Sequence, residues 1–136
     1  MLQEIAIQLR AMQLFAHNGH NLVTGPTFFS DHEFLSKLYE GYTESYDSVV
    51  ERAIGTDYSI DLQTVTQEAA MKASLYPDEE MKVCSKIIGN LLSMENSLIA
   101  LLNGANATAT FGTQDLLQSL ASEAESRKYL MLQRMK

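Results

Sequence analysis

Four long stretches of this sequence repeat apolar residues at the three-to-four-residue spacing of an α-helix, and almost nothing interrupts them. The only prolines are Pro26 and Pro77. In the first stretch, the repeating residues are Ile5, Leu9, Met12 and Ala16. Long amphipathic helices bury their apolar stripes by packing against one another. The sequence therefore predicts an all-α fold, a four-helix bundle formed by a single domain over residues 1–136.

Capping residues and turns give the expected boundaries. The predicted helices cover residues 2–22, 30–54, 61–74, 78–102 and 113 onward. Ser30 is the expected N-cap of the second helix, Gly55 its stop, and Asn103-Gly104 the end of the fourth. Leu116, Leu117, Leu120, Ala124 and Leu130 are the expected core stripe of the last helix. The short helix over 61–74 is a crossover, so the second and third long helices run parallel.

Composition limits the classes of protein that fit. A net charge of −7 argues against general attraction to nucleic acid or anionic membranes, and it suits a protein that attracts cations. No apolar run reaches the roughly 18 residues of a membrane span, and the start lacks the features of a secretory signal. The single cysteine, Cys84, is expected to be a small buried apolar residue. These features predict a cytoplasmic protein.

Residues with metal-binding chemistry share one face of the second helix. At about 100° per residue, and with His32 at zero, Ser36 lies at about 40°, Asp47 at about 60° and Glu51 at about 100°. His32 and Asp47 are nevertheless about 22 Å apart along the axis. One metal ion reaches both only if a second copy packs antiparallel, with a two-fold axis near Gly41. From spacing alone, a solvated helix face is the favoured interpretation.

A longer motif favours the metal site over the solvated helix face. Residues 16–33 read AHNGHNLVTGPTFFSDHE, residues 38–40 read LYE, and residues 47–51 have the form D-x-x-x-E. The C-terminal part contains GTQDLL and YLML. In residue types and spacing, these segments resemble the Dps mini-ferritins, a ferritin-like family known for protecting DNA during starvation. The resemblance covers nearly the whole chain.

The resemblance implies a ferritin-like bundle and a hollow shell of twelve subunits. It also implies ferroxidase sites at the two-fold interfaces, with His20 and His32 as ligands from one chain and Asp47 and Glu51 from the next. By this carry-over the four residues are both the metal ligands and the catalytic residues. Iron(II) is expected to be oxidised there by hydrogen peroxide or O₂ and stored as a ferric mineral, with zinc as a competing metal.

Two departures from the family pattern bear on activity. Ser36 stands where the family usually has an aspartate ligand, and Asn21 replaces a tryptophan that lies near the metal. The stripe of Tyr39, Tyr42 and Tyr46 is a candidate substitute for that aromatic residue, although packing at an interface is the favoured interpretation. An alternative function is therefore a Dps-like structural shell with a degraded metal site, acting in DNA compaction or assembly.

The family also has an iron-entry pore and, in some members, a basic tail that binds DNA. The pore is lined by carboxylates near the start of the last helix, where this chain has Thr110, Phe111 and Asp115. No lysine precedes Lys37, and the chain is acidic, so DNA binding is not expected. The expected partners are iron ions and other copies of the chain.

Overall fold

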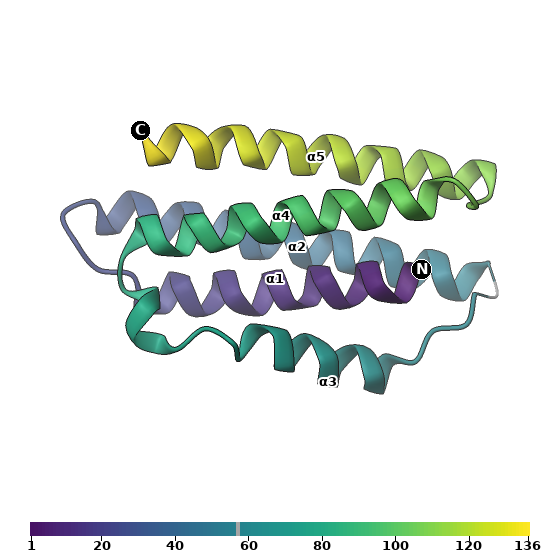
Figure 1. The fold of residues 1–136 in the computed structure, drawn as a ribbon, viewed down its shortest axis with the longest axis horizontal. Helices are drawn as coiled ribbons and strands as arrows, with labels where there is room; N and C mark the ends of the chain where they lie inside the picture. The colour runs from purple at the N-terminus through teal and green to yellow at the C-terminus, as the bar shows by residue number, and fades with distance from the viewer. Residues whose placement is uncertain (57) are drawn as a thin grey trace.

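The computed structural model describes residues 1–56 and 58–136, and this part of the chain forms five α-helices and one short 3₁₀ helix. They are α1 (Leu2–Leu22), α2 (Phe28–Gly55), α3 (Leu62–Ala73), η1 (Asp78–Met81), α4 (Cys84–Asn106) and α5 (Phe111–Met135). The four long helices lie side by side, with α3 along the outside of α1 (Figure 1). Because the chain crosses the length of the bundle through α3, α2 and α4 run parallel. The predicted fold class and crossover helix are confirmed.

Helix α1 is the centre of the core, since it packs against α2, α3 and α4. The predicted stripe on α1 is fully buried, and three alanines on the same helix let its neighbours approach closely. Those alanines are Ala6, Ala11 and Ala16. Asp61 caps the start of α3 by accepting hydrogen bonds from the backbone N–H groups of Gln63 and Thr64.

The first turn of α2 starts earlier than predicted. The helix begins at Phe28, and Ser30 is inside it rather than at its N-cap. Thr27 occupies the N-cap position but makes no capping hydrogen bond with its side chain. Its hydroxyl instead donates to the carboxylate of Asp31, at 2.7 Å. The first turn of α2 therefore lacks the local cap that usually stabilises a helix start.

Both boundaries of α4 also differ from the prediction. The acidic residues 78–80 form η1, and α4 starts only at Cys84. The carbonyl oxygen of Lys82 accepts hydrogen bonds from the N–H and the hydroxyl of Thr24, at 2.9 and 3.0 Å. This oxygen is therefore used outside the helix, and the helical hydrogen-bond pattern is interrupted at Lys82. At the other end, Asn103-Gly104 does not break the helix, which runs to Asn106. The helix-propensity cost of one glycine, about 1 kcal/mol, is smaller than the stabilisation from the buried face of α4.

The inner face of α5 has an unusual composition. Its residues follow an alternating spacing of four and three: Thr113, Leu117, Leu120, Ala124, Arg127, Met131 and Arg134. Leu130 was expected in this stripe but is 51% exposed, while Met131 is buried, because the spacing passes through 131. Two of the seven positions hold arginines, which form ion pairs with the buried Glu95 and Asp31. Helix α5 begins at Phe111, two residues before the predicted start, with Thr110 as its N-cap.

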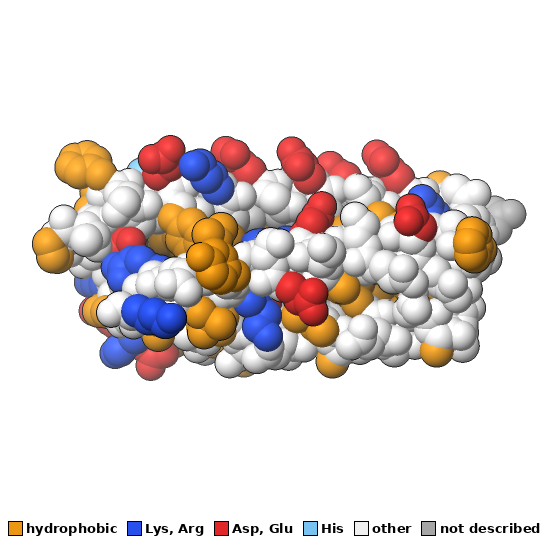
Figure 2. Space-filling view, turned by 90° about the horizontal axis from the view of Figure 1, so that it is seen from above, with side chains coloured by type: hydrophobic (Ala, Val, Ile, Leu, Met, Phe, Trp, Pro, Cys, Tyr) orange, Lys and Arg blue, Asp and Glu red, His pale blue; other side chains and the backbone are white. Residues whose placement is uncertain are grey.

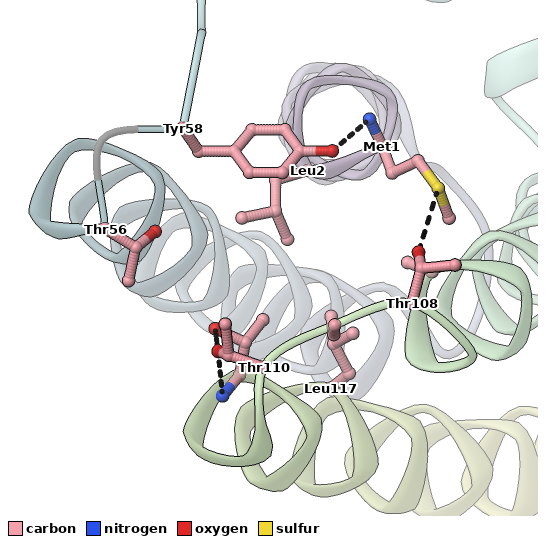
Figure 3. A pocket seen from close by; sticks show the side chains of 10 residues that line it. Met1, Leu2, Thr56, Tyr58, Thr108, Thr110 and Leu117 are labelled. Carbon is pink, nitrogen blue, oxygen red and sulfur yellow. Dashed lines mark hydrogen bonds between the residues drawn. The ribbon is translucent and has the colours of Figure 1, made fainter.

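A small cavity of about 120 Å³ lies at the end of the bundle where α1 starts (Figure 3). Leu2, Leu117 and several threonines line it, and the amino group of Met1 donates to the hydroxyl of Tyr58 beside it, at 3.1 Å. Its described lining contains no histidine, cysteine or carboxylate, so it offers no strong metal ligand. None of the helices described is apolar over enough of its length to span a bilayer.

Candidate metal centre

Two histidines from α1 and α2 stack on each other at the other end of the bundle. His20 lies in the last turn of α1 and His32 in the second turn of α2. Their ring centroids are 3.6 Å apart, and the ring planes differ by 18°. The Nδ1 atom of each ring lies 2.7 Å from the backbone carbonyl oxygen of the other residue. The tight turn between the helices includes Gly25, whose φ of 115° favours glycine.

These reciprocal hydrogen bonds fix the tautomer of both rings. A carbonyl oxygen only accepts hydrogen bonds, so each Nδ1 carries a hydrogen and donates it. In a neutral imidazole the other nitrogen, Nε2, then keeps its lone pair. Neither Nε2 is used in a hydrogen bond within residues 1–56 and 58–136. Metal-binding histidines are typically held in this way, with one nitrogen donating to a carbonyl group and the other free for the metal.

Aromatic side chains hold the histidine pair from both sides. Phe28 stacks on His32 with centroids 4.9 Å apart, and Tyr39 lies edge-on to His20 at 5.4 Å. The third histidine, His17, stacks on Tyr39 at 4.1 Å and lies 6.1 Å from His20. The pair is half-buried among these rings.

The tyrosine stripe belongs mainly to the core of the chain itself. Tyr42 and Tyr46 are buried where α2 packs on the rest of the chain, which agrees with packing as the favoured interpretation of the stripe. Only Tyr39 is partly accessible, beside the histidines.

Asp47 and Glu51 lie farther along α2, on its solvent face. Both are exposed, and the structure does not bring them to the histidines of the same chain. No group of three or more potential metal ligands forms within the residues described. The exposed acids of α2 are Glu33, Glu40, Glu44, Asp47 and Glu51. Acidic side chains form a row along the upper edge of Figure 2, the side on which α2 lies.

Ser36 and Gly41 have local roles that the sequence did not indicate. The hydroxyl of Ser36 donates to the carbonyl oxygen of Glu33 at 2.7 Å, so it is satisfied within its own helix. Gly41 lines a groove between α2 and α5, together with Ser45 and Leu120. A Cβ added at Gly41 would meet nothing within 4 Å, so no close approach within the chain requires a glycine there, and its role at a two-fold axis stays a prediction.

The ion pair of Asp31 with Arg134 was not predicted from the sequence. Asp31 is 2% exposed, and the guanidinium of Arg134 holds the pKa of its carboxyl group below the usual range. The thiol of Cys84 lies beside this carboxylate and is buried, as predicted, and burial raises its pKa to about 11. The alternating spacing on α5, which places Arg134 on the inner face, is the sequence signal that identifies this contact.

Comparisons with known proteins agree with this architecture. The family model described as the ferritin-like domain matches residues 2–134. The chain belongs to the ferritin-like family. It is similar to the DNA protection during starvation protein of Brevibacillus brevis, with 24% identity over 117 residues, covering 85% of this chain and 78% of that protein. It is also similar to the DNA protection during starvation protein 2 of Deinococcus radiodurans, with 33% identity over 76 residues, covering 56% of this chain and 32% of that protein.

Among solved structures, the fold of this ferritin-like chain is similar to the crystal structure of Dps92 from Deinococcus radiodurans. The TM-score is 0.63 at 22% sequence identity, and the match covers 96% of this chain and 80% of the other. These matches place the chain among the Dps mini-ferritins, as the motifs in residues 16–51 predicted. The family as a whole is associated with iron storage and protection against oxidants.

Proposed function

We propose that this mini-ferritin oxidises iron(II) and stores the ferric product, at sites completed between two copies of the chain. The observation that supports this most directly is the histidine pair. His20 and His32 are held by each other's backbone carbonyl oxygens, which leaves two neutral Nε2 atoms as ligands. The hydrogen bonds that orient the two rings therefore leave the same nitrogen available on both of them.

The remaining ligands in this proposal come from the neighbouring copy. Asp47 and Glu51 are exposed carboxylates on the solvent face of α2, and they lie too far along the helix to reach His32 of their own chain. An antiparallel partner helix would set them beside the histidines. Two nitrogens and two anionic oxygens form a mixed donor set that suits iron(II), and zinc competes for such a set.

The chemistry at the site is the oxidation of iron(II), which is the substrate. Two iron(II) ions each lose one electron to one molecule of hydrogen peroxide, and with two protons this gives two iron(III) ions and two water molecules. The carboxylates of Asp47 and Glu51 favour iron(III) over iron(II), because oxygen anions stabilise the higher charge. The neutral histidines hold the iron without adding charge of their own.

The proposal requires assembly. The resemblance to Dps proteins sets the expected number of subunits at twelve, and Dps homologues form oligomers. We expect sedimentation at micromolar protein to show one large species. A stable monomer under those conditions would rule out the shared site.

The direct test is to mix the protein anaerobically with iron(II) and then with peroxide, and to follow the ferric absorbance. His32→Ala and Glu51→Ala should each slow the reaction strongly without dispersing the shell, because each removes a ligand. Glu44→Gln is the matched control, since it removes an exposed carboxylate from the same face of α2 without removing a proposed ligand. Equal rates in all four proteins would show that the iron reacts elsewhere.

One observation favours a second function, a structural shell with a weakened site. Ser36 supplies no carboxylate, and its hydroxyl is already engaged with Glu33. A shell of this kind would assemble normally, and its His32→Ala variant would bind iron(II) as well as the parent does. With a net charge of −7 per chain, DNA binding is not expected, and a gel shift at about 150 mM salt tests this; tight complexes would favour a shell that acts in DNA compaction.

A further inference from the structure

A bidentate ion pair between Arg134 and Asp31 connects the last turn of α5 to the first turn of α2. Nε of Arg134 donates to Oδ1 of Asp31 at 2.8 Å, and Nη2 donates to Oδ2 at 2.9 Å. The same Nη2 atom lies 3.1 Å from the hydroxyl oxygen of Thr27. Paired contacts of this kind fix orientation as well as distance, because the guanidinium and the carboxylate are both planar.

The turn that receives these contacts directly precedes His32, which opens the second turn of α2. Asp31 directly precedes His32, and Thr27 occupies the N-cap position of α2. Both the carbonyl oxygen and the ring of His32 are used in the reciprocal bonds with His20. A displacement of this turn by about 1 Å would lengthen both 2.7 Å contacts beyond hydrogen-bonding range.

That turn has no side-chain cap on its free backbone N–H groups. Thr27 makes no capping hydrogen bond, because its hydroxyl donates to Asp31 instead. The loop before it is attached to the segment preceding α4 through Thr24 and Lys82. The first turn of α2 is therefore held by contacts from α5 and from the segment before α4, rather than by its own cap.

We infer that Arg134 is a positioning residue for the histidine pair: through Asp31 and Thr27 it orients the first turn of α2, and with it the Nε2 atoms of His20 and His32. This inference rests on the proposed function, since it concerns how well the pair is arranged for a metal. It assigns a role at the site to a residue 103 positions away from Asp31 in the sequence. Arg134 itself touches no ligand.

The test uses cobalt(II) as a spectroscopic probe of the assembled protein, together with amide hydrogen exchange of the metal-free protein. Arg134→Met should keep the number of sites but weaken cobalt(II) binding by about tenfold, the size typical for loss of a group that orients a ligand. It should also speed exchange in peptides covering residues 20–33. Arg134→Lys keeps the charge but not the paired geometry, so it should restore binding only partly.

Arg127→Met is the matched control, because it removes the other inward-facing arginine of α5 but does not touch α2's first turn. It should lower stability while leaving cobalt(II) affinity and exchange over residues 20–33 unchanged. If Arg134→Met matches the parent in both readouts, or if Arg127→Met has the same effects, the inference is wrong. If the parent itself binds no cobalt(II), the proposed function fails instead.

Discussion

The ion pair between α4 and α5 gives a prediction whose size depends on pH. Glu95 is fully buried, and Nη2 of Arg127 donates to its Oε1 atom at 2.9 Å. The hydroxyl of Tyr42 also donates to this carboxylate, at 3.3 Å, and Lys128 adds positive charge nearby. Burial raises the pKa of Glu95 above its ordinary value of 4.5, while Arg127 opposes that rise. Arg127→Met removes the opposing charge and should raise the pKa of Glu95 further.

The direction in which the stability of Arg127→Met changes with pH follows from proton linkage. A carboxyl group whose pKa is higher in the folded state stabilises the fold fully below its unfolded pKa, and this contribution is lost as the pH rises toward the folded pKa. Each pH unit in that window costs about 1.4 kcal/mol. Between pH 5.5 and pH 7.5 the deficit of Arg127→Met relative to the parent should therefore grow by up to about 2.7 kcal/mol. For a chain of this length, about 3 kcal/mol corresponds to roughly 10 °C in Tm.

Thermal unfolding at both pH values, at one fixed protein concentration, measures this deficit. Glu95→Gln combined with Arg127→Met removes the titrating group, so the double variant should show no such pH dependence. Glu79→Gln breaks the exposed pair with Lys82 and should change stability by less than about 1 kcal/mol at either pH. An Arg127→Met deficit that is the same at pH 5.5 and 7.5 would refute the reasoning.

Four further predictions concern single residues. Gly41→Ala should stabilise the chain by about 0.5–1 kcal/mol in urea unfolding, since an added Cβ meets nothing within 4 Å. Gly19→Ala should destabilise the chain, because the added Cβ would lie 3.1 Å from Cγ2 of Ile87. A destabilising Gly41→Ala or a stabilising Gly19→Ala would contradict these two predictions. Cys84 should react with a thiol reagent at pH 8 at least about 100-fold more slowly in the folded protein than in urea, because a pKa of about 11 in place of 9.0 leaves little thiolate. Ser36→Asp should tighten zinc or iron(II) binding in calorimetry, and no change would indicate that this position does not face the metal.

Much of the fold could be predicted because long amphipathic helices leave few alternatives. The stripe through Ile5, Leu9 and Met12 and the crossover helix before Pro77 follow from periodicity and breaking residues alone. The errors lie where a distant contact overrides a local signal. The helix predicted from residue 78 is interrupted at Lys82, because the carbonyl oxygen of Lys82 accepts a hydrogen bond from Thr24, 58 residues away.

The candidate site was only partly accessible to sequence analysis. The family motif identified His20 and His32 as a pair, but their stacking and reciprocal hydrogen bonds depend on the exact approach of α1 to α2. The ion pair of Asp31 was not predicted, since nothing near Asp31 in the sequence indicates that Arg134 is its partner. The meeting of Asp47 and Glu51 with the histidines involves a second copy and stays a prediction.

The ion pair between Arg134 and Asp31 also has a consequence for the order in which the helices pack during folding. Helices α1 and α2 are adjacent in sequence and pack extensively, so they are able to associate as an early hairpin. Asp31 meets its partner only when the last turn of α5 arrives, and α5 itself packs chiefly on α4 and barely touches α2. We expect pulsed hydrogen exchange during refolding to protect the middle of α1 and α2 first and residues 20–33 last. A nascent or half-folded chain would then present its histidines in poor geometry, and would capture iron only after folding is complete.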